Sequence, residues 1–142
     1  MAIDTKLIDG QGSGNHAKVT SRGQLVVAPL EYSEFYRTKA TVVNTAYNIV
    51  GPKTGKRFVI TTIILNASRN VSSTVEADVV LYEAESASTT TVTKTVFEQG
   101  LLKQQTVTIT ALNVILSEGV WLNLKTDDND ITVNIAGYYV DA

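Results

Sequence analysis

Histidine chemistry in this chain would have to come from His16, because the chain has a single histidine. A Ser–His–acid triad needs an imidazole held rigidly beside its nucleophile. His16 follows a polar stretch punctuated by Gly10, Gly12 and Gly14, a composition that cannot bury enough apolar surface to order itself. We therefore interpret His16 as a surface residue rather than a general base.

Nucleophilic and metal chemistry through sulfur is excluded, because the chain contains no cysteine. Acid–base catalysis by paired carboxylates stays open, since Asp and Glu are plentiful, but the spacing of these residues singles out no pair. We expect a protein that is not an enzyme and that uses no cofactor, no metal and no small-molecule substrate.

Two short segments could hold ions. The alternating glycines at 10–14 suggest a phosphate-binding loop, but such a loop follows a strand and opens a helix, and neither is predicted here. Residues 127–130, Asp-Asp-Asn-Asp, offer hard oxygen ligands for Ca²⁺. Their spacing does not match an EF-hand loop, and the same residues are typical of turns. A plain turn is the favoured interpretation, and a cation site is the alternative.

Composition predicts one folded domain. Of the 142 residues, 44% are hydrophobic and 18% are charged, which supplies a real core and argues against global disorder. The first residues carry Asp4 and Asp9 and lack the apolar stretch of roughly 7–15 residues that a secretory signal needs. The absence of cysteine fits a protein made in a reducing cytoplasm.

The charge is distributed unevenly along the chain. Residues 1–57 hold eight basic and four acidic residues (+4), whereas residues 58–142 hold four basic and ten acidic residues (−6). Solvated surfaces are the simpler interpretation; opposite-sign contacts between subunits, or a basic arm on an acidic neighbour, are the alternative. The basic groups at 37–39 and 53–57 are too short for a phosphate backbone, so we expect no nucleic-acid partner. The sequence has no long apolar run, so we expect no membrane partner either.

Residues 1–28 are predicted to form an extended arm. Val19 and the run Leu25–Val27 flank Ser21-Arg22-Gly23, a pattern that predicts a hairpin or one sharp bend. Residues 29–142 are predicted to form the body. One helical turn is possible at its start, where Tyr32, Phe35 and Tyr36 have helical spacing.

The body is predicted to be all-β. Roughly eight short strands follow one another at spacings of about 8–15 residues, with no segment patterned as a long helix. This rhythm favours a single antiparallel β-sandwich, with a jelly roll as first choice and an immunoglobulin-like sandwich as second. The expected strands lie in residues 40–44, 46–50, 57–67, 74–85, 93–97, 105–110, 113–116, 120–125 and 131–140.

The strand at 57–67 is apolar on both faces. Strict alternation puts Phe58, Ile60 and Ile64 on one face and Val59, Ile63 and Leu65 on the other. A strand of this kind belongs in the middle of a sandwich or under a subunit contact. We also expect Leu101 and Leu102 to pack over an open end of the sandwich.

Three further side chains are predicted to point away from the core. Val80 and Tyr82 alternate with core residues of their strand, and Trp121 lies opposite Leu122. Outward Trp and Tyr are typical anchors of protein interfaces. These residues therefore suggest a contact between subunits, and the alternative is that an arm or loop of the same chain covers them.

Both ends of the chain resemble a group of small virion proteins of tailed bacteriophages. The arm reads DGQGSGNHAKVTSRGQLVVAP and the end reads VWLNLKTDDNDITVNIAGYYVDA. The matching positions are Gly12, Gly14, Ala17, Lys18, Val19, Leu25, Gly137, Tyr138, Tyr139 and Val140. The resemblance implies a non-enzymatic structural protein located in the virion. It most closely suggests a capsid decoration, or cement, protein that is trimeric and binds the major capsid protein.

In such a protein the arm would bind a neighbour. Lys18 and Arg22 would carry the charge contacts, and Val19, Leu25 and Val26 could add a strand or an apolar anchor. The alternative is a tail, fibre or host-surface module that binds carbohydrate. That module would use Trp121 and the loops at 86–91 and 127–130.

Overall fold

The computed structural model describes residues 18–19, 25–26, 34–69, 71 and 76–142. The chain divides into two units, residues 1–31 and 32–142. In the first unit, β1 (Lys18–Val19) pairs antiparallel with β2 (Leu25–Val26), Val19 lying opposite Leu25, so the predicted hairpin pairing is confirmed. Arg22 and the predicted arm boundary after residue 28 lie outside the described residues.

The described residues of the second unit form nine strands. They are β3 (Glu34–Ala40), β4 (Tyr47–Val50), β5 (Lys56–Ala67), β6 (Ala77–Ala84), β7 (Lys94–Leu101), β8 (Thr106–Ile109), β9 (Val114–Ile115), β10 (Trp121–Thr126) and β11 (Ile131–Asp141). They form two antiparallel sheets, of order β4-β10-β6-β7 and β3-β11-β5-β8. We call these the β10 sheet and the β11 sheet; the short β9 pairs with β5 and so belongs to the β11 sheet.

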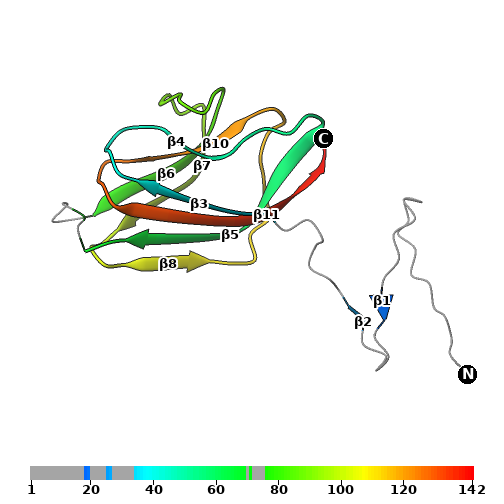
Figure 1. The fold of residues 1–142 in the computed structure, drawn as a ribbon, viewed down its shortest axis with the longest axis horizontal. Coiled ribbons are helices and arrows are strands. Elements are labelled where there is room, and N and C mark those ends of the chain that lie inside the picture. The colour runs from blue at the N-terminus through cyan, green and yellow to red at the C-terminus, as the bar shows by residue number, and fades with distance from the viewer. Residues whose placement is uncertain (1–17, 20–24, 27–33, 70, 72–75) are drawn as a thin grey trace, which may run out of the picture. The chain divides into compact units, whose positions relative to one another are not determined.

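The two sheets pack face to face, so the predicted β-sandwich is confirmed (Figure 1). The first and last strands of the unit, β3 and β11, are neighbours in one sheet, and β4 and β10 are neighbours in the other. Most consecutive strands lie in opposite sheets, and the hairpin β6–β7 is the exception among the long ones. This is the strand arrangement of a jelly roll, the first-choice topology.

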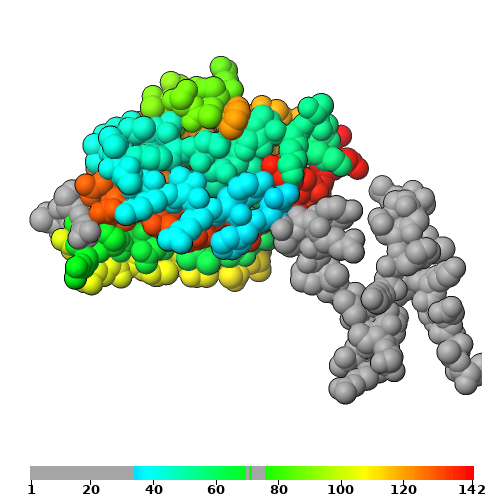
Figure 2. Space-filling view, in the orientation of Figure 1, coloured from blue at the N-terminus to red at the C-terminus, as the bar shows by residue number. Residues whose placement is uncertain are grey.

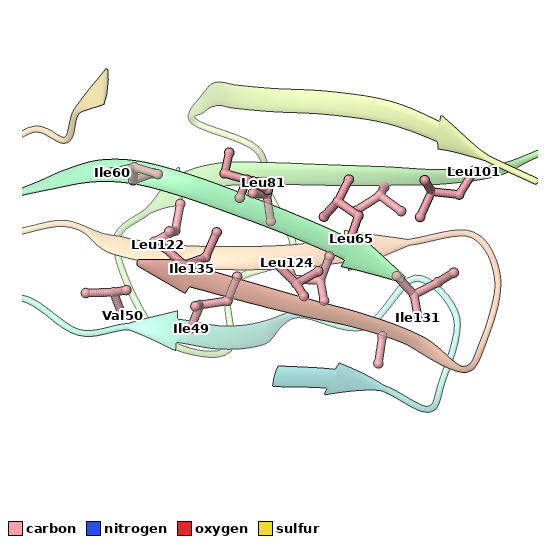
Figure 3. Close-up of a cluster of buried hydrophobic side chains, with 14 of the residues drawn as sticks. Ile49, Val50, Ile60, Leu65, Leu81, Leu101, Leu122, Leu124, Ile131 and Ile135 are labelled. Carbon is pink, nitrogen blue, oxygen red and sulfur yellow. The ribbon is translucent and has the colours of Figure 1, made fainter. Parts of the chain in front are cut away.

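The core lies between the sheets and is almost entirely aliphatic. Leu81, Leu122 and Leu124 from the β10 sheet face Leu65 and Ile135 from the β11 sheet, and all five are fully buried (Figure 3). Each of these residues alternates with outward-facing neighbours, as expected for strands with one buried face. Burial of this apolar surface is the main stabilising term of the sandwich.

A β-bulge divides β5 and changes which residues face the core. Ala136 of β11 lies opposite Thr62, but the next residue, Gly137, lies opposite Ile60, so Thr61 is the extra residue. Core-facing positions are therefore Phe58 and Ile60 before the bulge and Ile63, Leu65 and Ala67 after it. The prediction that strict alternation would put Ile64 with Phe58 was wrong, since the bulge shifts the phase by one residue.

Gly137 is required at this bulge. A Cβ atom on Gly137 would lie 2.1 Å from the Val59 carbonyl oxygen and 2.6 Å from Cζ of Phe58. Such distances are far inside van der Waals contact, so even alanine would displace the backbone or the Phe58 ring.

Three local predictions were wrong. The helical turn around Phe35 and Tyr36 is instead strand β3, because pairing with β11 outweighs a single turn of helical spacing. Residues 41–46 do not form a strand; they turn the chain, with Asn44 at a φ of 53°. Leu102 is 52% exposed, whereas Leu101 is buried as the last residue of β7, so the two do not pack together over an end.

Candidate partner interface

Tyr82 lies on the outer face of the β10 sheet, as predicted, but it is fully buried. Its hydroxyl donates to the Thr89 carbonyl at 2.8 Å, and Nδ2 of the neighbouring Asn123 donates to the Ser86 carbonyl at 2.9 Å. Both bonds hold the loop 85–93, drawn yellow-green, on the outer side of this sheet (Figures 1 and 2). Burial raises the pKa of Tyr82, against a smaller opposing effect of Asn123. A loop of the same chain therefore covers Tyr82, which is the alternative that the sequence left open.

Trp121 lies on the same outer face and is half-buried. Its ring packs against the backbone of Gly51, where an added Cβ atom would lie 3.1 Å from Cζ3 of the indole. The tryptophan therefore stabilises the turn that follows β4, and only part of its surface is left for a partner.

Val80 lies in the most acidic part of the outer face. Its cross-strand neighbours are Glu98 on β7 and Lys125 on β10. Asp78, Glu98 and Asp127 are all exposed around it. The acidic character of residues 58–142 is thus partly gathered on this face, which is typical of a solvated surface.

The outer face of the β11 sheet is different, because its centre carries no formal charge. The outward residues of β11 are Thr132, Asn134, Ala136, Tyr138 and Val140, and those of β5 opposite them include Val59, Thr62, Ile64 and Asn66. On β8 the outward positions are Thr106 and Thr108. The basic residues of this face lie at its border, with Arg37 and Lys39 on β3 and Arg57 near the start of β5.

An apolar stripe crosses this uncharged face diagonally. Phe35 on β3 lies opposite Ala136, and two residues further along β11 the half-buried Tyr138 lies opposite Val59, which in turn lies opposite Ile115 on β9. Val59 itself is buried beneath its neighbours. The two ends of the stripe are well exposed, Phe35 at 65% and Ile115 at 49%. Interface centres are poor in charge and rich in aromatic side chains, so this stripe has the composition of a contact surface.

The structure thus separates the predicted contact residues. Lys18, Val19, Leu25 and Val26 lie in the hairpin unit. Val80, Tyr82 and Trp121 share the outer face of the β10 sheet, but with Tyr82 covered they do not form one exposed patch.

Sequence reasoning missed Phe35, Ile115 and Tyr138 as surface residues. The sequence feature that pointed to an apolar outer face was the strand at 57–67, which is apolar on both faces. Both outward positions of that strand, Val59 and Ile64, belong to the uncharged face, but Val59 is buried and Ile64 is half-buried.

Glu83 is a buried carboxylate on the inner face of the β10 sheet. Its Oε1 accepts hydrogen bonds from the Ser117 backbone N–H at 2.9 Å and from Nζ of Lys94 at 3.0 Å, and its Oε2 accepts from Oγ of Ser117 at 2.8 Å. Burial alone would raise the pKa of Glu83, but the bonds from Ser117 and Lys94 together hold that pKa below its usual value. An ionised, fully bonded carboxylate of this kind fixes the loop after β9, and its lowered pKa makes it a poor proton acceptor.

All three carboxylates of the acidic loop at 127–130 are engaged within the fold, and that of Asp130 pairs with Nζ of Lys39. Oδ1 of Asp127 accepts from the Asp78 backbone N–H, and Oδ1 of Asp128 accepts from the Asn129 backbone N–H, both at 2.7 Å. Across the described residues, no group of three or more His, Asp or Glu side chains is placed to hold a metal ion.

The described part of the chain also contains no helix with the length and apolar character needed to cross a membrane. No protein-family model matches the chain, and no curated protein shows significant similarity to it.

Proposed function

We propose that this chain is a non-enzymatic structural protein of a tailed-phage particle, a capsid decoration protein that binds the head shell as a homotrimer. The resemblance of the two ends of the chain to small virion proteins supports this role. The observation that carries it is the uncharged outer face of the β11 sheet, with its stripe from Phe35 to Ile115.

The uncharged face is the proposed contact between copies. A sheet face that stays in water normally alternates core residues with charged ones, as the β10 sheet does around Asp78 and Lys125. On the β11 sheet the same positions carry Thr, Asn, Ile and Tyr. Burying Phe35 and Ile115 would remove apolar surface from water, and the centre of the face between them holds no charge to desolvate, which is the favourable case for association.

The hairpin arm is the proposed contact with the shell. Between residues 10 and 30 the sequence carries Lys18 and Arg22 and no acidic residue. Three arms in one trimer would bind together, so that weak single contacts add to a strong one. A protein that binds the assembled shell better than free subunits stabilises the shell by mass action.

Binding of the full chain to particles stripped of it tests this role. We expect the wild type to bind heads and to raise the temperature at which they release DNA. The double variant Lys18→Glu with Arg22→Glu should bind at least about tenfold more weakly, because two charge contacts are reversed. Lys103→Glu, an exposed control between β7 and β8, should bind like the wild type. Equal binding by the arm variant, or binding to isolated tails instead of heads, would contradict the proposal.

A further inference from the structure

A hollow of about 370 Å³ lies at the end of the sandwich where β3 begins and β11 ends, which is also the end at which the C-terminus lies (Figure 1). Among the described residues, its lining consists of Glu34 on β3, Lys53 in the turn before β5, Lys56 at the start of β5 and Tyr139 on β11. This volume falls within the range of small-molecule sites, roughly 300–1,000 Å³. Three separate stretches of chain therefore bring a carboxylate, two ammonium groups and a phenol to one small space.

The wall formed by Glu34, Lys53 and Tyr139 is held in place by its own contacts. Nζ of Lys53 donates to Oε1 of Glu34 at 3.0 Å and lies 3.9 Å from the centre of the Tyr139 ring. The Tyr139 hydroxyl donates to the Gly51 carbonyl at 3.1 Å. A ligand entering the hollow would thus meet groups that are already positioned, which lowers the entropic cost of binding.

Tyr36 orients the carboxylate of Glu34. Its hydroxyl donates to Oε2 of Glu34 at 3.3 Å, and its ring packs edge-on against Phe58. Burial, the neighbouring Tyr139 hydroxyl and the Glu34 charge all raise the pKa of Tyr36, so this hydroxyl keeps its proton and remains a donor. Glu34 itself can only accept hydrogen bonds when ionised, so it calls for a ligand that donates them.

Lys56 takes part in an exposed ion pair. Its partner in the structure is Asp141, whose side chain is 88% exposed, and the Lys56 side chain is 44% exposed. Exposed ion pairs of this kind contribute little to stability and exchange readily. Lys56 can therefore turn to an anion in the hollow at small cost.

We propose that this hollow binds a hydroxylated carboxylate of the size of a sugar acid. The described lining holds two ammonium groups, and a ligand carboxylate that takes the place of the exposed Asp141 would bind Lys56 as well as Lys53. Glu34 would accept hydrogen bonds from the ligand's hydroxyl groups. A free sugar acid and the acidic terminal residue of a glycan present the same chemistry. The proposal is independent of the subunit contact, since the hollow lies at the end of the sandwich and not on its outer face.

Titration of the full-length protein with glucuronic acid, followed by amide chemical shifts, tests the proposal. We expect saturable shifts in the turn around Lys53 and at the end of β11. Glucose should bind more weakly because it lacks the carboxylate, and inorganic phosphate more weakly because it lacks the pattern of hydroxyl groups. Titration with a disaccharide that ends in glucuronic acid separates a glycan end, which would then bind better, from a free acid. Shifts that are absent, or equally strong with phosphate, would overturn the proposal.

Two variants locate the binding groups. Lys56→Met should weaken glucuronic acid binding at least about tenfold through loss of one charge-assisted hydrogen bond. Glu34→Gln should also weaken glucuronic acid, whereas it should strengthen acetate, which has no hydroxyl groups for the carboxylate to accept. Lys103→Met, which removes an exposed lysine elsewhere, should leave both affinities unchanged. Thermal unfolding shows whether each variant is folded, and unchanged affinity in a folded Lys56→Met would contradict the assignment.

Discussion

The two outer faces of the sandwich come from the same kind of strand but present opposite surfaces. On the β10 sheet, exposed Asp78 and Glu98 flank Val80, and a loop of the chain covers Tyr82. On the β11 sheet, the central strands present Thr, Asn and apolar residues, with Phe35 uncovered at one edge. Among the described residues, a loop and charged side chains cover the β10 face, whereas the centre of the β11 face has neither a covering loop nor a charged side chain.

The two outer faces differ because a loop of the chain packs on the β10 sheet, whereas a bulge turns apolar residues outward on the β11 sheet. Loop 85–93 folds back because Tyr82 and Asn123 supply hydrogen bonds for it. On the β11 sheet, the bulge at Thr61 turns Ile64 outward and puts it on the same side as Val59. An interface centre without charge avoids the desolvation cost that makes buried ions unfavourable. We therefore regard the β11 face as the one that another molecule completes.

The largest expected effect comes from the bulge that builds the uncharged face. Gly137→Ala should lower the free energy of unfolding by about 3 kcal/mol or more, since the new Cβ would overlap the Val59 carbonyl. Urea unfolding of the full chain measures this. Gly119→Ala is the matched control, because Gly119 has a φ of 74° but nothing within 4 Å of an added Cβ. It should cost only about 1 kcal/mol of backbone strain. Equal costs for the two would mean that close packing at the bulge is unimportant.

The second-largest effect on stability is expected at Glu83. This residue of the β10 sheet holds the loop just after Ile115, which belongs to the β11 sheet. Glu83→Gln should cost about 2 kcal/mol at pH 7, because hydrogen bonds to a charged group are replaced by weaker ones. The pKa of Glu83 is lowered in the folded protein, so its ionised form stabilises the fold above the unfolded pKa of about 4.3. That contribution is lost as the pH falls through the folded pKa.

The difference in stability between wild type and Glu83→Gln should therefore shrink below about pH 4. Chemical unfolding at a series of pH values measures it. Glu85→Gln, an exposed control two residues further on, should change stability by less than about 0.5 kcal/mol. A Glu83→Gln difference that stays constant down to low pH would show that the carboxylate charge is not what stabilises this loop.

A smaller effect is expected at the cover of the β10 sheet. Tyr82→Phe removes the hydrogen bond to Thr89 and should cost about 1 kcal/mol. Hydrogen exchange should increase in loop 85–93 and little elsewhere. Tyr138→Phe removes a hydroxyl from the outer face of the other sheet and should change the stability by less than about 0.5 kcal/mol. Unchanged exchange in Tyr82→Phe would mean that the loop is held by other contacts.

The smallest effect is expected from the charges of the β10 face. Asp78→Asn combined with Glu98→Gln should alter the free energy of unfolding by less than about 0.5 kcal/mol, because both side chains are exposed. The mass in solution should also stay unchanged. A change in mass would indicate that the subunit contact lies on the β10 face and not on the β11 face.

The sequence was sufficient to predict the architecture but not the surface. Alternation in residues such as Val79 and Leu81, and the turn residues between strands, correctly predicted an all-β sandwich. The bulge at Thr61 could not be predicted, because it depends on Gly137, some 75 residues away along the chain. A side chain on the outer face of a sheet is not always exposed to solvent. Alternation correctly predicted that Tyr82 lies on the outer face, but the loop that covers it follows a path that sequence periodicity does not encode.

Long-range contacts also explain why the sequence of residues 53–56 did not predict the hollow that they line. In the sequence, Lys53 and Lys56 form a small basic group in a turn. The hollow arises because the jelly-roll topology brings Glu34 from the first strand of the body and Tyr139 from the last to that turn. Such long-range neighbours follow from strand order and not from local pattern.

The central claim is that the outer face of the β11 sheet makes the contact between copies. Light scattering after gel filtration measures it directly on the wild type and on two matched variants, Ile64→Lys and Val80→Lys. Both replace a half-buried aliphatic residue at an outward position of a central strand, one on each face. The account predicts a trimer for the wild type and for Val80→Lys, and a monomer for Ile64→Lys. A monomeric wild type, or a trimer that survives Ile64→Lys and is lost in Val80→Lys, would contradict it.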